Sequence, residues 1–437
     1  MRGSDATAEA PVFGLSGTYK RYALGTLTLV FTLNSLDRVL LNLLSQPIKD
    51  DLHLSDTQLG FLTGIAFGLF YATLGLPIAR WADRGNRVTL VSIAIGVWGG
   101  TVMLCIFVTS FVQLLAARVA AAIGESGCMP PSYSLLGDYF PGSAERSRAM
   151  TIYWLASPLA GLISCIAGGW LNEIYGWRIT FLLMGIPGLL LAVLVKFSLI
   201  EPRLQLQPAR VLQPRQPRII HVVAMLWMRP ACRHLSIAIV LLYVMALGLG
   251  PWYAAFMIRC HGMGTAELGL WLGLTFGISG LVGTGLGGYA AVRWFADNER
   301  GQMRLTAVMT ASLVPCFIVF LLVPQKVQAL LALVPLMVVF CFFLGPTFAL
   351  LQRLVEDEIR ATALAVVMLF ANLIGMGLGP QVVGILSDLL RPTVGNDSLR
   401  YAMLAMSCVA PWAAYHFWAA GSAPSADDRT VWRPPYS

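Results

Sequence analysis

Long apolar runs recur along this chain, and they limit the possible folds more than any other feature. Each run has about the length of a helix and shows no alternation of apolar and polar residues, so a β-barrel is excluded. A helix needs about 20 apolar residues to cross a bilayer. Because lipid offers the backbone no hydrogen-bond partners, a run inside a membrane must be helical. The pattern predicts an all-α, polytopic membrane protein.

Twelve such runs are present, and charged residues are scarce between them. Charged residues make up 12% of the 437 residues, against about 25% in soluble domains, and the mean hydropathy is +0.71. We predict membrane spans at 22–45, 57–79, 88–109, 112–137, 148–171, 178–198, 233–257, 267–291, 304–323, 327–351, 360–388 and 398–419. The predicted domains are a tail (1–21), a six-helix bundle (22–198), a loop (199–232), a second six-helix bundle (233–419) and a tail (420–437).

The basic residues are distributed unevenly between the two predicted sides. With the N-terminus inside, 22 of the 30 Lys and Arg face inward and 6 face outward. This asymmetry predicts that both termini are cytoplasmic, in a multi-pass protein of the cell membrane. The net charge of +8 is then explained by topology and contact with anionic lipids, and no nucleic-acid partner is expected. The first nineteen residues do not resemble a cleaved signal peptide.

The second half of the sequence repeats the first. LGFLTGIAFG (59–68) matches LGLWLGLTFG (268–277) at an offset of 209, and PSYSLL (131–136) matches PTFALL (346–351) at an offset of 215. The two bundles should therefore be related by pseudo-symmetry. The spaced glycines, which are Gly60, Gly64, Gly68, Gly269, Gly273 and Gly277, are typical of close helix contacts in lipid. Pro130 and Pro131, Pro251 and Pro346 should break the fourth, seventh and tenth spans.

Four ionisable residues lie inside predicted spans, where a charge costs a few kcal/mol and is by default a candidate functional group. They are Asp37 and Arg38 in the first span and Arg118 and Glu125 in the fourth. Depth along the helices favours pairing Arg38 with Glu125 and Asp37 with Arg118. A desolvated Glu125 or Asp37 could take up a proton and release Arg38. A static ion pair that only sets helix register is the alternative.

The repeat offers an internal control for these charges. The equivalent positions of the second half are Ala246, Leu247, Leu333 and Phe340, none of which is ionisable. This asymmetry favours proton coupling by Asp37, Glu125 and Arg38 over helix adhesion. The predicted substrate site combines Arg38, Arg118 and Glu125 with the aromatic residues Tyr243, Trp252 and Phe340. A cavity that is charged on one side and apolar on the other suits an amphiphile, although such aromatic residues most often pack within the fold.

Several of these segments resemble a known family. GLPIARWADRGNR (75–87) resembles the loop signature of the major facilitator superfamily, from which Pro77 and Asn86 depart. RVAAAIGESGCMPPSYSLLGDYFP (118–141) resembles the spinster branch more narrowly. The resemblance implies two six-helix bundles around a cavity with alternating access, and it implies lysophospholipid or sphingolipid substrates, with proton coupling in some members. It also implies a cytoplasmic gate, for which we assign Asp83, Arg84, Arg87 and Arg146; Asp83 should cap the third span.

We therefore predict a monomeric secondary transporter for an amphiphilic, lipid-like molecule, coupled to protons. A multidrug or organic-anion exporter of the same superfamily is the alternative. A membrane-embedded lipid enzyme is a third hypothesis, which the five scattered His residues do not favour. The eight Cys residues include no CxxC motif, and no GxxxxGK[ST] motif is present. No metal, cofactor or direct use of ATP is expected.

Overall fold

The computed structural model describes residues 15–204, 219–295, 298–356 and 359–422, and this part of the chain contains helices but no strands. The α-helices are α1 (Gly17–Leu52), α2 (Asp56–Thr63), α3 (Ile65–Arg84), α4 (Arg87–Leu104), α5 (Phe111–Ser126), α6 (Met129–Tyr139), α7 (Ser143–Trp154), α8 (Ala156–Ser198), α9 (Ile219–Met228), α10 (Pro230–Leu249), α11 (Trp252–His261), α12 (Thr265–Arg293), α13 (Glu299–Ala311), α14 (Leu313–Leu322), α15 (Lys326–Phe342), α16 (Leu344–Leu354), α17 (Arg360–Val394), α18 (Ser398–Ser407) and α19 (Val409–Ser422). Three short 3-10 helices, η1 (Cys105–Phe107), η2 (Pro202–Leu204) and η3 (Gly395–Asp397), complete the list. The all-α prediction is confirmed.

The helices account for twelve membrane crossings. Nine stretches of the described chain are long and apolar enough to cross a membrane, and two of these have the length of two crossings, Ser143–Ser198 and Thr362–Ser422. The first turns at Gly176 and the second at Gly395, where φ is 78° and 60°. Glycine enters this left-handed region without the steric cost of a Cβ atom. The helices α2 and α3 supply the remaining predicted span.

Proline interrupts three crossings where the sequence predicts it. The fourth crossing divides into α5 and α6 just before Pro130 and Pro131, the seventh divides at Pro251, and the tenth divides just before Pro346. Proline has no backbone N–H group to donate to the preceding turn, so the helical hydrogen-bond ladder is broken at these points. The predicted breaks are confirmed.

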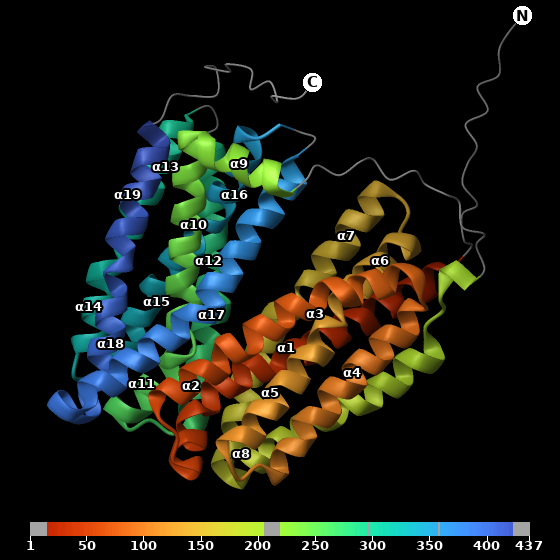
Figure 1. The fold of residues 1–437 in the computed structure, drawn as a ribbon, viewed down its shortest axis with the longest axis horizontal. Helices are drawn as coiled ribbons and strands as arrows, with labels where there is room; N and C mark the ends of the chain where they lie inside the picture. The colour runs from red at the N-terminus through yellow and green to blue at the C-terminus, as the bar shows by residue number, and fades with distance from the viewer. Residues whose placement is uncertain (1–14, 205–218, 296–297, 357–358, 423–437) are drawn as a thin grey trace, which may run out of the picture.

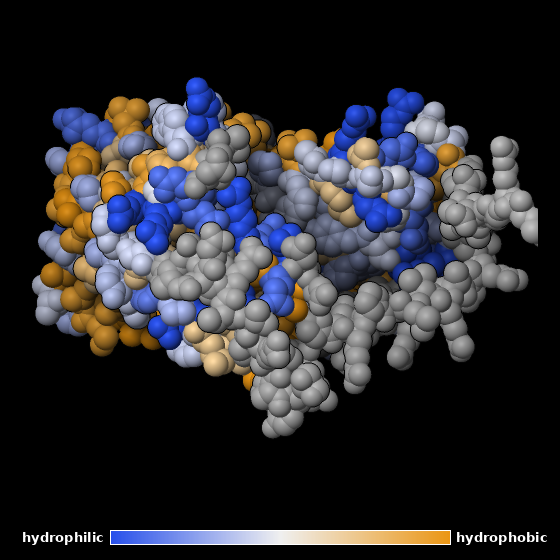
Figure 2. Space-filling view, turned by 90° about the horizontal axis from the view of Figure 1, so that it is seen from above, coloured by the Kyte–Doolittle hydropathy of each residue, from blue (hydrophilic) through white to orange (hydrophobic). Residues whose placement is uncertain are grey.

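Two bundles are separated in space (Figure 1). The helices α1 to α8 form the first bundle, drawn red to yellow-green, and α10 to α19 form the second, drawn green to blue. The bundles diverge toward the face at which α1 begins and α19 ends, which we call the terminal face, and they meet at the other end, which we call the opposite face. Seen onto the terminal face, the molecule shows two lobes with a recess between them (Figure 2).

Glycines allow the two bundles to touch near the opposite face. A Cβ atom on Gly269 would lie 1.9 Å from the carbonyl oxygen of Cys165, and one on Gly60 would lie 2.6 Å from that of Pro380. Both contacts join the first bundle to the second, so these glycines are packed against backbone. At Gly277, by contrast, an added Cβ would meet nothing within 4 Å. The predicted glycine ridge on α12 therefore makes contacts near the opposite face and not at Gly277. On the ridge of α2 and α3, added Cβ atoms at all three glycines would lie within 4 Å of α17.

The loop between the bundles contains the helix α9. Its side chains Val222, Met225 and Leu226 are buried, but Ile219 and Trp227 are exposed. The exposed side of α9 is thus largely apolar.

Candidate functional site

Four charged side chains form two ion pairs inside the first bundle. Arg38 Nη2 lies 2.6 Å from Glu125 Oε1, and Arg118 Nη1 lies 2.5 Å from Asp37 Oδ2. Asp37 and Arg38 come from α1, and their partners come from α5. Adjacent residues on a helix point about 100° apart, so Asp37 and Arg38 point in different directions and reach different partners on α5. Both pairings predicted from helix geometry are confirmed.

The two pairs differ in access to solvent. Asp37 and Arg118 are buried, and Asp37 Oδ1 also accepts a hydrogen bond of 3.0 Å from the indole Nε1 of Trp98. In the other pair, the side chain of Arg38 is 31% exposed whereas that of Glu125 is 2% exposed. A ligand could therefore reach Arg38 directly. In this conformation, Arg118 offers no such access.

Phe67 connects the two pairs. Its ring centroid lies 5.4 Å from the guanidinium carbon of Arg38 and 5.3 Å from that of Arg118. The negative faces of an aromatic ring attract such cations. Phe67 is buried and stacks on Tyr71 with a centroid separation of 5.5 Å. The sequence analysis missed Phe67 as a site residue, although it lies within the repeated LGFLTGIAFG motif.

The site contains buried polar atoms that lack hydrogen-bond partners among the described residues. They include Oε2 of Glu125, Nε of Arg118, Nδ2 of Asn34 and Oγ of Ser35. Most buried polar groups in proteins are paired, so an unpaired group is a candidate for a functional role. The second carboxyl oxygen of Glu125 is available for a proton or for a ligand.

The aromatic residues of the predicted substrate site do not join this cluster. Trp252 is 1% exposed, and its Nε1 donates to the carbonyl oxygen of Pro380 at 3.3 Å. Phe340 is 6% exposed and packs edge-on against Phe317. Only Tyr243 is partly exposed. In this conformation, Trp252 and Phe340 are core residues of the second bundle.

The predicted gate residues are found in separate environments. Arg87 is fully buried, pairs with Glu201, donates from Nη1 to Ser134 at 2.8 Å and contacts Asp138 at 2.7 Å. Burial alone would raise the pKa of the Glu201 carboxyl, but hydrogen bonds and charge from Arg87 hold that pKa below its usual range. The guanidinium of Arg146 donates to backbone carbonyls, including that of Phe140 at 3.2 Å.

The predicted cap of the third span is wrong. Asn86, not Asp83, is the N-cap of α4, and its side-chain oxygen accepts from the backbone N–H of Thr89 at 2.8 Å. Asp83 still belongs to the end of α3, and so cannot occupy the extended position that a cap requires. The side chains of Asp83 and Arg84 lie outside the described residues.

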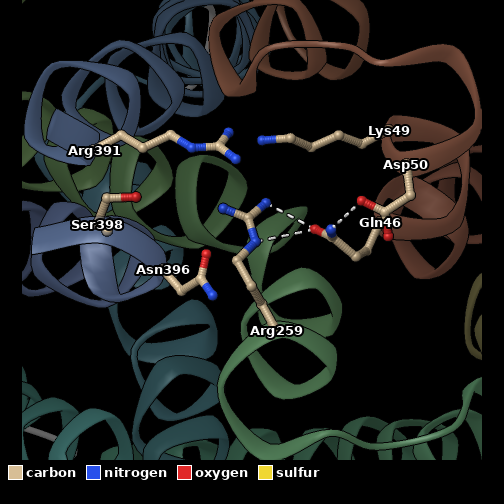
Figure 3. Close-up of a pocket in the computed structure, with 8 residues that line it drawn as sticks. Gln46, Lys49, Asp50, Arg259, Arg391, Asn396 and Ser398 are labelled. Carbon is tan, nitrogen blue, oxygen red and sulfur yellow. Dashed lines mark hydrogen bonds between the residues drawn. The ribbon is translucent and has the colours of Figure 1, made fainter.

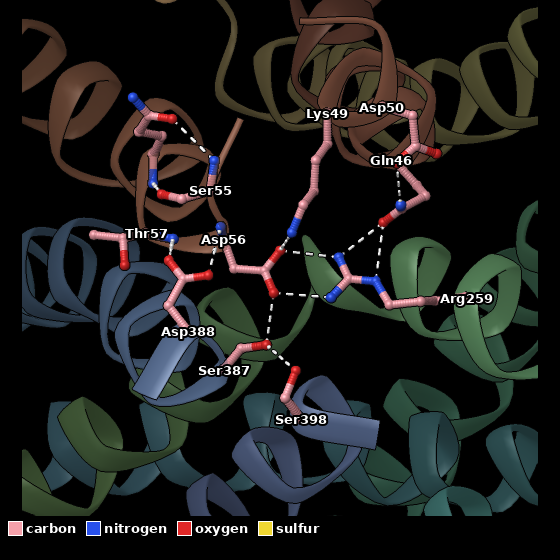
Figure 4. Close-up of polar contacts among 11 residues, drawn as sticks. Gln46, Lys49, Asp50, Ser55, Asp56, Thr57, Arg259, Ser387, Asp388 and Ser398 are labelled. Carbon is pink, nitrogen blue, oxygen red and sulfur yellow. Dashed lines mark hydrogen bonds and ion pairs between the residues drawn. The ribbon is translucent and has the colours of Figure 1, made fainter. Parts of the chain in front are cut away.

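A polar region that the sequence analysis missed joins the bundles at the opposite face. A cavity of about 230 Å³ lies there, lined by Gln46, Lys49, Asp50, Arg259, Arg391, Gly395, Asn396 and Ser398 (Figure 3). Beside it, Asp56 is fully buried and pairs with Lys49 (Figure 4). Arg259 contacts the same carboxylate with two nitrogens, at 2.8 and 2.9 Å, and Ser387 Oγ donates to it at 2.6 Å. In the sequence, Lys49 and Arg259 are only two of the six outward-facing basic residues. Their shared partner Asp56 becomes apparent only when the two bundles are placed together.

Two helix starts at the opposite face are capped by carboxylates from the other bundle. The backbone N–H groups of Asp56 and Thr57, at the start of α2, donate to Asp388 of α17 at 3.0 and 2.7 Å (Figure 4). The backbone N–H of Ala266, at the start of α12, donates to Glu173 of α8 at 2.8 Å. A carboxylate at a helix N-terminus satisfies free N–H groups and interacts favourably with the helix dipole. Each bundle thus donates one cap and receives one.

Sequence comparison identifies the family of this protein. The family described as Major Facilitator Superfamily matches residues 27–380. The chain belongs to this superfamily, and it is therefore a multi-pass membrane transporter and not an enzyme. The hypothesis of a membrane-embedded lipid enzyme is accordingly wrong.

Individual relatives show which members of the superfamily the chain resembles. An MFS-type efflux pump of Mycolicibacterium smegmatis is 35% identical over 87% of this chain and 88% of its own length. The sphingosine-1-phosphate transporter SPNS2 of Danio rerio is 24% identical over 87% of this chain and 80% of its own length. A crystal structure of a bacterial homologue of the human lysosomal transporter Spinster, inward-facing and unoccupied, superimposes with a TM-score of 0.83 and 28% identity, covering 93% of this chain and 98% of that one. The predicted spinster-like resemblance is confirmed.

Proposed function

We propose that this chain moves an amphiphilic, lipid-like molecule of the lysophospholipid or sphingolipid type across the cell membrane by proton-coupled alternating access. The uneven distribution of Lys and Arg supports a cytoplasmic terminal face, with both chain ends inside. The opposite face is then external. The bundles diverge toward the terminal face, so this conformation corresponds to an inward-facing state.

The Arg38–Glu125 pair is the observation that carries this proposal. Arg38 is accessible while Glu125 is enclosed, so an anionic headgroup can bind the guanidinium without entering the bundle. That headgroup then competes with Glu125 for Arg38. A carboxylate left buried without its counter-ion is costly, and binding a proton removes this cost. The anionic substrate and the proton should therefore bind together.

The gate on the cytoplasmic side is part of the same proposal. Arg87 ties the start of α4 to the segment after α8 through Glu201, and to α6 through Asp138. We assign Arg87 and Arg146, with Asp83 and Arg84 at the end of α3, to the closing of this side. The contacts of Arg87 and Arg146 described above join helices of the first bundle to one another and to the segment just after α8. These residues would therefore act as a rigid platform that the second bundle meets.

Efflux of drug-like molecules is the second candidate, and the relative at 35% identity supports it. The two candidates use the ion pair in opposite ways. A cationic drug would bind Glu125 in place of Arg38, and a proton on Glu125 would then exclude it. Acidification should strengthen the binding of an anionic amphiphile such as lysophosphatidic acid and weaken that of a cation such as ethidium. Measuring both affinities in detergent between about pH 5 and pH 8 separates the candidates, because Glu125 must change protonation within this window for coupling at working pH.

Glu125→Gln tests the proton coupling itself. The amide keeps the shape of the side chain and can still accept from Arg38, so the protein should fold, but it cannot bind and release a proton. We expect transport driven by a pH gradient in proteoliposomes to fall to the level of empty vesicles. Glu267→Gln is the matched control, because Glu267 is 42% exposed and, among the residues that the structure describes, pairs with Lys326 alone. Undiminished pH-driven transport by Glu125→Gln would exclude Glu125 as the proton carrier.

A further inference from the structure

The cavity at the opposite face has an excess of positive charge. Lys49 of α1, Arg259 of α11 and Arg391 of α17 line it, and Asp50 is the only acidic residue among its described lining residues. One oxygen of Asp50 already accepts from the amide of Gln46 at 2.8 Å. The cavity lies between the two bundles, and its wall therefore exists in this form only while the external side is closed.

Arg391 is the cation without a compensating group. Lys49 and Arg259 share the carboxylate of Asp56, which lies beside the cavity. No hydrogen bond or ion pair is found for the exposed guanidinium of Arg391 within the described part of the chain. In Figure 3 its tip points across the cavity toward the ammonium of Lys49. Two like charges that face each other repel. An anion bound between them would be attracted to both and would offset the repulsion.

One neutral side chain of the same wall also suits an anion. Asn396 contributes an amide that can donate hydrogen bonds. The buried hydroxyl of Ser398 already donates to Ser387, whose own proton goes to Asp56. Arg and Lys together with such donors are the usual partners of phosphate and carboxylate groups. A cavity of about 230 Å³ has room for a headgroup of this kind and for little of an acyl chain.

We propose that this cavity is a binding site for an oxyanion, either phosphate or carboxylate, that approaches from the external side. The anion is either free in the medium or the headgroup of a lipid of the external leaflet. The site is separate from the Arg38–Glu125 pair. Lys49 and Arg38 lie eleven residues apart on α1, which corresponds to about 16 Å along a helix.

Binding of inorganic phosphate to the purified protein in phosphatidylcholine nanodiscs tests the proposal. We expect saturable binding, measured by calorimetry, that is at least about tenfold weaker in Arg391→Gln because a charge-assisted hydrogen bond is lost. Asn396→Asp should weaken binding similarly, since it adds a negative charge to the wall without removing packing. Lys326→Gln is the control. Lys326 is a basic residue at the opposite face, as Arg391 is, but it pairs with Glu267 and does not line the cavity.

A second arm of the experiment separates the two sources of the anion. In nanodiscs that contain phosphatidylglycerol, a lipid headgroup in the site should compete with phosphate, and Arg391→Gln should abolish the difference between the two kinds of nanodisc. Equal phosphate affinity in both kinds of nanodisc would identify the free anion as the ligand. The absence of saturable binding, or an equal loss in Arg391→Gln and Lys326→Gln, would overturn the proposal.

Discussion

The contact between Gly269 and Cys165 predicts that a single methyl group can open the opposite face. In Gly269→Ala the new Cβ would lie 1.9 Å from the carbonyl oxygen of Cys165, while real Cβ atoms essentially never approach other atoms to within 3.0 Å. The neighbour is backbone, so a change of rotamer cannot relieve the clash. The two bundles must separate by about 1 Å or more at this point.

The magnitude follows from the cost of overpacking. An extra methyl group in a packed interface costs about 1–3 kcal/mol. The conformation with the opposite face closed bears this cost, whereas a conformation that opens this face by separating α8 from α12 avoids it. The ratio of protein open at the opposite face to protein open at the terminal face should therefore rise by about 5- to 150-fold.

Distances between spin labels provide the assay. Labels at Thr109 and Gln325, which are exposed in the loops before α5 and α15, would report the separation of the bundles in a background that lacks the eight native cysteines. We expect Gly269→Ala to increase the population at long distance. Gly277→Ala is the matched control on the same helix, because its Cβ would meet nothing within 4 Å. Identical distance distributions for the two variants would refute the reasoning.

Two further predictions concern the buried Arg87 cluster. Glu201→Gln should lower the free energy of unfolding by about 3 kcal/mol, since it breaks a buried ion pair. Asp138→Asn should lower it by less than about 1 kcal/mol, because the Asp138 side chain is 37% exposed; unfolding by SDS in mixed micelles measures both, and equal losses would contradict this ranking. The folded-state pKa of Glu201 lies below its ordinary value of 4.5, so its contribution is complete above that pH and is lost as the pH falls through the folded-state value. Wild-type stability should drop more steeply than that of Glu201→Gln below about pH 4, and parallel curves would argue against Glu201 as the titrating group.

Much of the fold follows from the sequence because lipid leaves the backbone few choices. Helix-length apolar runs, the internal repeat and the prolines of the fourth, seventh and tenth spans were sufficient to predict the twelve crossings and their breaks. The predicted cap at Asp83 is wrong for a local reason. The helix α3 continues through Asp83, so Asn86 is the residue that precedes α4 and caps it.

The two ion pairs were predictable because depth along a helix is fixed by residue number. Arg38 and Asp37 had few charged partners at the right height, so Glu125 and Arg118 could be assigned. Their different exposure could not be predicted, since it depends on how side chains of the first bundle, such as Trp98 and Phe67, pack around Asp37 and Arg118. The Asp56 cluster was missed because Arg259 reaches it from the other bundle.

The exchanged caps of α2 and α12 divide the closure of the opposite face into two equal roles. The two capping residues, Glu173 and Asp388, are 215 residues apart. Two of the residues that they cap, Thr57 and Ala266, are 209 apart. Both offsets are those of the internal repeat, so the two caps are equivalent in the two halves. Neither carboxylate can be withdrawn without exposing a helix start in the other bundle. Loss of one cap leaves its counterpart intact, and a single substitution should therefore loosen the external seal without removing it.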